Sequence, residues 1–381
     1  MKFTEYVDVN PKTNLKKGEY APFVEMANVS ITYREPEKIE NKKYTSGPKF
    51  QNGDSVVARI EPCLQNGKRF FWKSDKIGFG STEYIVFRAK EGKMDSKYLF
   101  YLLKTDYIKK SMVSSMVGAT GRQRVNNDIF GQIEIVVPNI EKQKKIGRTL
   151  FLYDDLIENN QKQIKLLEEA AQRLYKEWFV DLRFPGHENT KIVDGVPEGW
   201  NEKTLSQVAN VIMGQSPKSE FYNSEKRGLP FHQGVGSYGV RFVIDDIYST
   251  SYTRIAEPNS ILFSVRAPVG RLNITKNKVV IGRGLAAINQ TDGCQSYLYY
   301  LLKNKFFKDN IVGNGSIFAS VSKDELLNQK FLIPERNLMM QFEKIVSQMD
   351  KQIENLDSKN KRLIEARDRL LPKLMSGEVE V

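Results

Sequence analysis

The feature that most constrains this chain is an internal repeat with a period near 200 residues. Residues 98–104 read YLFYLLK and residues 297–303 read YLYYLLK, which differ at one position. Further along, IEIVVP and QKFLIP end at Pro138 and Pro334, and from these prolines the halves align without a gap at an offset of 196. Solenoid repeats are several times shorter, so this period indicates a duplicated domain pair.

Each half shows the same order of local patterns. Short β-type runs come first, VVARI, RFFWK and YIVFR in one half and ILFSV, VVIG and AAIN in the other. Apolar residues at helical spacing then predict one helix around 97–110 and another around 296–309. A glycine-rich segment follows at 117–121 and at 312–316, and upstream the pair Gly78 and Gly80 resembles Gly282 and Gly284.

Two long segments have the composition of uninterrupted helices. Residues 139–180 contain no proline and only one glycine, Gly147, and residues 335–371 contain neither. Apolar residues recur at spacings of three and four over four heptads, which is typical of a coiled coil. The seam of the first helix is Leu150, Tyr153, Ile157, Asn160, Ile164, Leu167, Ala171, Leu174 and Trp178, and that of the second is Val346, Met349, Ile353, Leu356, Asn360, Leu363, Arg367, Leu370 and Leu374.

Each long helix needs a partner for its narrow apolar seam, and the simplest partner is the other helix. An alternative is that each helix packs on its own β domain, but the remaining faces are crowded with charge, which favours a two-helix pair. Pseudo-twofold symmetry makes that pair antiparallel, with Asn160 and Asn360 as register-setting residues. About 40 residues at a rise of 1.5 Å give a rod roughly 60 Å long.

The predicted fold is therefore of the α+β class: two similar mixed α/β domains separated by two long antiparallel helices that form a coiled coil, with a pseudo-twofold internal repeat. The expected segments are a first domain at 1–138, a first helix at 139–183, a linker at 184–199, a second domain at 200–334, a second helix at 335–377 and a tail at 378–381.

Charge and composition narrow the class of protein. Lys plus Arg is 58 against 46 for Asp plus Glu, a net charge of +12. This charge favours a polyanionic partner, nucleic acid before an anionic membrane surface, and the alternative is that it serves solubility alone. The sequence has only two cysteines and two histidines, Cys63, Cys294, His187 and His232. They lie too far apart in the sequence to indicate a disulfide framework or a zinc cluster. No run approaches 18 apolar residues and the N-terminus has no apolar core, so we expect no membrane association and a cytoplasmic protein.

Catalytic motifs do not stand out in the sequence. Residues 234–239 fit G-x-G-x-x-G, but VRFVIDD follows where a dinucleotide-binding fold needs a helix, so a turn or a DNA-facing loop is favoured. There is no phosphate-binding G-x-x-x-x-G-K-[ST] loop, no Asn-Pro-Pro-aromatic run and no paired-carboxylate-plus-lysine nuclease pattern. We therefore expect a binding protein that holds no cofactor or metal and is not an enzyme.

The order of elements resembles the specificity subunits of type I restriction–modification systems over nearly the whole chain. The most specific stretch is EWFVDLRFPGHE at 177–188, which looks like the central conserved region of that family. VDVNPKT at 7–13 and VPEGWNEKTLSQVANVIMGQSPKSEFY at 196–222 are similar to the starts of its target-recognition domains, and LLPKLMSGEVEV at 370–381 to its C-terminal end. The chain departs from the family at IPERNLMMQ, where a Pro-Leu-x-Glu-Gln run is common.

The resemblance implies a function for the whole chain. It implies a non-catalytic subunit that binds an asymmetric double-stranded DNA target in two parts with a fixed gap, one part for each target-recognition domain. The long helices would space the domains and dock two methyltransferase subunits, to which restriction (motor–nuclease) subunits add. S-adenosylmethionine, ATP and Mg²⁺ would belong to these partners. The alternatives are a coiled-coil protein-interaction scaffold with incidental basic charge and a stand-alone nuclease or modification enzyme.

Base reading requires Arg, Lys, Asn or Gln side chains near glycine-rich loops. The candidate DNA contacts are Arg59, Lys68, Arg69, Arg122, Gln123, Arg124 and Asn126 in the first domain and Gln233, Tyr238, Arg241, Arg266, Arg271 and Arg283 in the second. The candidate spacer and docking residues are Leu150, Ile157, Ile164, Leu167, Leu174, Trp178, Phe179, Val346, Met349, Ile353, Leu356, Leu363 and Leu370. For Trp178 and Phe179, packing against a recognition domain is the alternative to docking.

Overall fold

A computed structural model of the chain describes residues 1–306 and 320–380, so the predicted glycine-rich segment at 312–316 lies outside the described residues. The chain divides into two compact units. The first unit consists of Met1–Ile164 and Asn355–Val381, and the second is Lys165–Glu354. Each unit combines one β-rich domain with a part of both long helices.

The β domain of the first unit holds two four-stranded sheets. The first sheet has the order β1 (Val7–Val9), β8 (Tyr84–Ala89), β5 (Ser55–Ala58) and β6 (Arg69–Phe71), all antiparallel. The second has the order β3 (Glu40–Lys43), β2 (Tyr20–Val24), β7 (Gly78–Gly80) and β4 (Lys49–Phe50), with β2 and β7 parallel. The first three residues of the predicted run VVARI lie in β5, which is buried along its whole length, as suits β-branched residues in a central strand.

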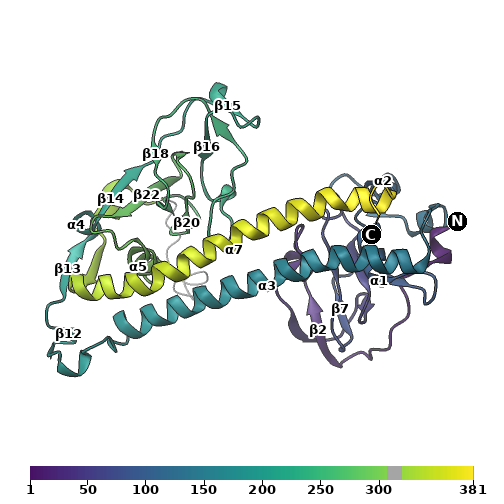
Figure 1. Cartoon of the computed structure of the whole chain (residues 1–381), viewed down its shortest axis with the longest axis horizontal. Helices are drawn as coiled ribbons and strands as arrows, with labels where there is room; N and C mark the ends of the chain where they lie inside the picture. The colour runs from purple at the N-terminus through teal and green to yellow at the C-terminus, as the bar shows by residue number, and fades with distance from the viewer. Residues whose placement is uncertain (307–319, 381) are drawn as a thin grey trace. The chain divides into compact units, whose positions relative to one another are not determined.

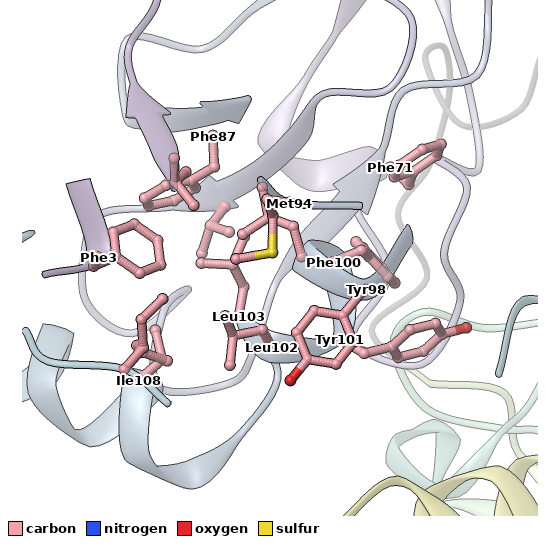
Figure 2. Packing of buried hydrophobic residues seen from close by; sticks show 14 of the residues in the cluster. Phe3, Phe71, Phe87, Met94, Tyr98, Phe100, Tyr101, Leu102, Leu103 and Ile108 are labelled. Carbon is pink, nitrogen blue, oxygen red and sulfur yellow. The ribbon is translucent and has the colours of Figure 1, made fainter. Parts of the chain in front are cut away.

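An aromatic core covers the first sheet of this domain, and Figure 2 shows part of it. Phe3, Phe87 and Tyr98 are buried in it, and the ring centroid of Phe71 lies 4.9 Å from that of Phe151 on the first long helix. The predicted helix at 97–110 is in fact two helices, α1 (Ser96–Leu102) and α2 (Asp106–Ser114), because Thr105 adopts an extended backbone and begins the second one. A short hairpin of β9 (Met116–Val117) and β10 (Arg124–Val125) follows them.

The second unit repeats this plan after a linker that contains the hairpin β11 (Ile192–Val193) and β12 (Val196–Pro197). Its first sheet has the order β14 (Ala209–Met213), β22 (Leu285–Gln290), β19 (Ile261–Ser264) and β20 (Leu272–Ile274). Its second has the order β15 (Tyr222–Asn223), β17 (Tyr248–Ser249), β16 (Leu229–His232), β21 (Val279–Ile281) and β18 (Ile255–Ala256), with β16 and β21 parallel. The helices are α4 (Leu205–Val208), α5 (Gln295–Phe306) and α6 (Lys323–Leu327), and β13 (Asn201–Thr204) pairs with β23 (Lys330–Ile333).

Strand pairing gives the residue correspondence between the two repeats. In the parallel pairs, Val24 lies opposite Gly80 in the first unit and His232 opposite Ile281 in the second. Gly80 therefore corresponds to Ile281, and the predicted match of Gly78 and Gly80 with Gly282 and Gly284 was wrong by three positions. These glycines have different neighbours, because Gly78 packs under the Phe50 and Trp72 rings whereas Gly282 and Gly284 pack against Gln233.

The long helices are α3 (Ile140–Phe179) and α7 (Arg336–Ser376), labelled in Figure 1. Within the first unit, α3 residues Ile146 and Leu150 share a core with α7 residues Leu371 and Leu374, and within the second unit Trp178 lies against Phe342. A low residue number on one helix thus meets a high number on the other, which confirms the antiparallel pair. All the predicted seam residues are buried or half-buried, and the mixed α/β repeat is confirmed with them.

Gly147, the one glycine in α3, has a packing reason. A Cβ atom there would stand 2.7 Å from Asp95 Oδ1 and 2.8 Å from the Tyr98 backbone nitrogen, at the beginning of α1. Only glycine allows α3 and α1 to approach this closely.

Candidate nucleic-acid interface

The predicted cluster of Arg122, Gln123, Arg124 and Asn126 lies in and beside the β9–β10 hairpin of the first unit. Arg122, Arg124 and Asn126 are exposed and Gln123 is half-buried. The turn is built by glycines with positive φ, Gly118 at 121° and Gly121 at 80°, which residues with a Cβ rarely adopt. The structure thus presents basic side chains on a tight turn.

The Arg124 side chain is held by a carboxylate. Its Nε donates to Glu83 Oε1 at 3.0 Å and Oε2 at 2.9 Å, and its Nη2 donates to Oε1 at 2.7 Å. This hydrogen-bonded Glu83 carboxylate also raises the pKa of Arg124 above its usual value. Asn126 is used locally, since its side chain accepts from the Asp128 backbone nitrogen at 3.1 Å and begins a short 3₁₀ turn.

The other three candidates of the first domain are half-buried and bound to backbone carbonyls. Arg59 Nη2 donates to Val125 O at 3.2 Å, and Lys68 Nζ donates to Met26 O at 2.7 Å. Arg69 donates to Gly67 O and Leu103 O, both at 3.1 Å, and burial lowers the pKa of Arg69 to about 10. These contacts hold loops together.

In the second unit, Gln233 and Arg283 come together at a cavity of about 890 Å³. Gln233 Oε1 accepts from Ser216 Oγ at 2.7 Å, and Ser216 Oγ accepts from the Arg283 backbone nitrogen at 3.2 Å. Tyr222, which also lines the cavity, stacks on Phe231 with ring centroids 4.6 Å apart. Tyr222 was not predicted from the sequence, although it ends a stretch that resembles the start of a recognition domain.

The remaining candidates of the second domain are spread over its surface and core. The Tyr238 hydroxyl donates to Leu262 O at 2.9 Å, and burial raises the pKa of Tyr238. Arg266 and Arg271 are exposed at either side of the β19–β20 connection. Arg266 also forms an isolated antiparallel bridge with Ser320.

Arg241 is corrected by the structure. Its side chain is only 2% exposed and binds Asp350 of α7, Glu168 Oε1 of α3 at 3.3 Å and the Tyr300 hydroxyl at 3.2 Å. A guanidinium paired with two carboxylates below the surface is not available to DNA. Sequence distance hid this role, because Asp350 lies 109 residues away.

The first unit has an equivalent arginine, Arg34, which was not predicted from the sequence. The Arg34 carbonyl accepts from the Phe71 backbone nitrogen, and the Arg241 carbonyl accepts from the Ile274 backbone nitrogen. Phe71 and Ile274 are equivalent, because each pairs with the first residue of the adjacent central strand, Ser55 of β5 or Ile261 of β19. Arg34 is buried and donates to Glu158 Oε1 at 2.9 Å and to Asp155 Oδ1 at 2.7 Å, both on α3. In both units, a buried arginine of the β domain therefore binds carboxylates of the long helices.

A second buried group sits beside Arg34. Asp154 of α3 binds both Arg367 of α7 and the Tyr101 hydroxyl of α1. At the offset of 196, Asp154 corresponds to Asp350, the carboxylate that binds Arg241. Each unit thus has an aspartate, an arginine and a tyrosine together where the β domain meets the helices, but the arginine comes from α7 in the first unit and from the β domain in the second.

The predicted docking residues are mostly internal. Leu150, Ile157, Val346 and Ile353 are at most 1% exposed, which fits a spacer. Ile164, Leu167, Leu174, Met349, Leu356, Leu363 and Leu370 complete the seam, each buried or half-buried.

The two aromatic residues at the end of α3 also pack inward. Trp178 is 8% exposed, and Phe179 lies 5.0 Å from Tyr297 and 5.2 Å from Phe342 between ring centroids. This is the packing alternative for Trp178 and Phe179, so they are core residues of the second unit.

Apolar residues that do face outward on the long helices were missed. In the first unit, Leu152 and Leu156 of α3 are 54% and 51% exposed. In the second unit, Leu166 of α3 is 63% exposed, and Met340 and Ile345 of α7 are 51% and 42% exposed. They lie off the heptad seam, which is why the seam pattern did not reveal them.

The described residues lack the features of two other classes of site. None of the helices in the described ranges combines the length and the apolar character of a membrane span. Among residues 1–306 and 320–380, no three His, Cys, Asp or Glu side chains gather in a way that would hold a metal ion.

Comparison with known proteins gives the family. The profile of the type I restriction modification DNA specificity domain matches the chain twice, at residues 8–169 and 197–366. The putative type I restriction enzyme MjaX specificity subunit of Methanocaldococcus jannaschii is 29% identical over 304 residues, 78% of this chain and 71% of that protein. The HindI specificity subunit of Haemophilus influenzae is 25% identical over 411 residues, 87% of each chain.

A solved structure supports the fold. The crystal structure of a type I restriction–modification system S subunit from M. genitalium matches with a TM-score of 0.60 at 18% sequence identity, over 98% of this chain and 95% of that one. Since the family profile covers both repeats, the resemblance seen in the sequence is confirmed, and this chain belongs to the type I restriction–modification specificity-subunit family.

Proposed function

We propose that this chain binds a DNA target in two parts, reading one half-site with each unit, and that it has no catalytic role of its own. The long helices set the gap between the half-sites. The observation that carries the proposal is that the two units share one backbone plan but present different polar side chains at equivalent positions.

The clearest difference lies at a bridge found in both units. Ile60 pairs with Arg124 in the first unit, and Arg266 pairs with Ser320 in the second. The positions correspond, because Val125 N donates to Arg59 O at 2.9 Å and Val321 N donates to Val265 O at 2.8 Å. One arginine is thus present in each bridge, but on opposite partners, so the two units would offer different donors to a base pair.

The cavity of the second unit supports the same reading. Gln233 can hydrogen-bond a base edge through its amide, and Arg283 offers a guanidinium beside it. Tyr222 adds a stacked aromatic surface. The net charge of +12 would strengthen binding to phosphates, which positions a protein on DNA without specifying sequence.

The helices would act as the spacer and as the docking surface for two methyltransferase subunits. Exposed apolar side chains of the kind represented by Leu152 and Leu156 favour a protein partner, since water contact with them is unfavourable. Restriction (motor–nuclease) subunits would join this core. In this proposal S-adenosylmethionine, ATP and Mg²⁺ bind those partners and not this chain.

The test is methylome sequencing of cells that co-express this chain with a cognate methyltransferase subunit. We expect a new methylated motif in two parts separated by a fixed run of unspecified bases. If a folded partner that binds S-adenosylmethionine produces no new methylation with this chain, the proposal is refuted and the coiled-coil scaffold is favoured instead.

A further inference from the structure

We propose that Glu83 is a positioning residue that fixes Arg124 to read a guanine in the first half-site. This inference rests on the proposed function and names one base pair within it. It concerns the pair formed by an exposed arginine on β10 and a carboxylate just before β8.

The geometry leaves one edge of the guanidinium open. Glu83 occupies Nε–H and one N–H of Nη2, and the Arg122 carbonyl accepts from Nη1 at 3.3 Å. A guanidinium has five N–H groups, so one on Nη1 and one on Nη2 remain at its far end. Two parallel donors match the N7 and O6 acceptors that guanine shows in the major groove.

Stability does not explain the pair. The Arg124 and Glu83 side chains are 45% and 23% exposed, and exposed ion pairs stabilise proteins by about 1 kcal/mol or less. The second unit builds the same backbone without it, because Gly284 and Ser320 take the places of Glu83 and Arg124. A rigid carboxylate that orients an exposed arginine is useful chiefly when that arginine must meet a ligand at a fixed angle.

The alternative use of Arg124 is a phosphate contact, which makes different demands. A phosphate accepts from a flexible arginine at many angles, and Glu83 would then only compete with the DNA for the same cation. Under the guanine reading, removal of Glu83 lowers discrimination at one position but strengthens sequence-independent binding, because one negative charge leaves the surface. A residue that merely supported the fold would not separate these two quantities.

The experiment uses the chain assembled with its methyltransferase partner and DNA duplexes in which each base pair of both half-sites is replaced in turn. Arg124→Ala and Glu83→Ala should both reduce discrimination at the same G·C pair of the first half-site, by roughly 5- to 140-fold for complete loss of a bidentate contact of about 1–3 kcal/mol. Glu83→Gln, which keeps one acceptor, should retain part of it. Binding to DNA without the motif should become stronger in Glu83→Ala, because one negative charge leaves the surface.

The matched control is Glu202→Ala, which removes a carboxylate from another exposed pair, Lys330–Glu202, in the second unit. It should leave discrimination unchanged at every position. Unchanged discrimination in Glu83→Ala, or an equal loss at all positions of the first half-site, would overturn the inference. Unchanged discrimination at the second half-site shows that the Glu83→Ala variant is folded. If the chain methylates a two-part motif but Glu83→Ala does not change discrimination, the inference about Glu83 is refuted and the proposed function still stands.

Discussion

Arg241 has one role predicted from the sequence and a different role in the structure. The sequence favoured a DNA contact, whereas the structure places its guanidinium below the surface between Asp350 and Glu168. Arg241→Ala leaves these carboxylates without their cation, and breaking a buried pair in this way costs about 3–5 kcal/mol. At roughly 2–4 °C per kcal/mol for a unit of this size, Tm should fall by about 6–20 °C.

The loss should also depend on pH. Burial already raises the pKa of Asp350, and Arg241 opposes that rise. Without Arg241 the pKa of Asp350 rises further, so the folded variant takes up a proton more readily than the unfolded chain. The stability of the variant is therefore greatest below the pKa that Asp350 has in the unfolded chain, and it is lost as the pH rises through the pKa that Asp350 has in the folded variant. The difference in Tm between the variant and the wild type should be smaller at pH 5 than at pH 8.

The assay is thermal unfolding of the full chain at both pH values, combined with base discrimination in the assembled methyltransferase. Arg241→Met with Asp350→Asn, which removes both charges of the pair, should recover part of the lost Tm. Arg283→Ala, an exposed arginine of the same unit, should leave Tm within about 2 °C. An Arg241→Ala variant with unchanged Tm but lost recognition of one half-site would refute the structural assignment and restore the DNA contact.

Three further predictions follow from the helices and the second unit. Insertion of seven residues at matched points of both long helices lengthens each helix by about 10 Å. Methylome sequencing should then show unchanged half-sites and a gap that is longer by roughly three base pairs. An unchanged gap would mean that the helices are not the spacer. Asn160 Nδ2 donates to Asn360 Oδ1 at 2.8 Å. Asn360→Leu should therefore lower the free energy of unfolding, measured by chemical denaturation, by about 1–3 kcal/mol, whereas leucine at both positions should restore or exceed wild-type stability. An Asn360→Leu variant of unchanged stability would contradict the pairing. Arg283→Ala should reduce discrimination by roughly 5- to 140-fold at one position of a single half-site, measured with duplexes in which each base pair is replaced in turn. An equal loss of discrimination in both half-sites would argue against the cavity as a reading site.

The sequence revealed what depends on local periodicity. The heptad positions of Ile157 and Ile353 predicted burial, and both side chains are at most 1% exposed. The duplication was also visible, because matched runs such as those around Tyr98 and Tyr297 form helices at equivalent places. Such features repeat along one segment and need no knowledge of distant contacts.

What the sequence could not reveal depends on pairs that meet only after folding. Arg241 and Arg34 look like surface cations in a strand or loop, and their carboxylate partners lie more than 70 residues away. The same is true of Glu83 and Arg124, separated by 41 residues. In each case the residue type predicts a charged contact, but only the fold decides whether its partner is a helix, a neighbouring loop or DNA.

The two kinds of arginine explain how one fold could read different sequences. Arg34 and Arg241 hold equivalent backbone positions, and both bind carboxylates of the long helices. A buried pair of this kind resists change, because loss of one partner leaves an unpaired charge. The bridge residues lie at the surface, where substitutions cost little stability. The scaffold would therefore stay fixed while the side chains offered to DNA diverge, as the exchange of Arg124 for Ser320 between the repeats illustrates.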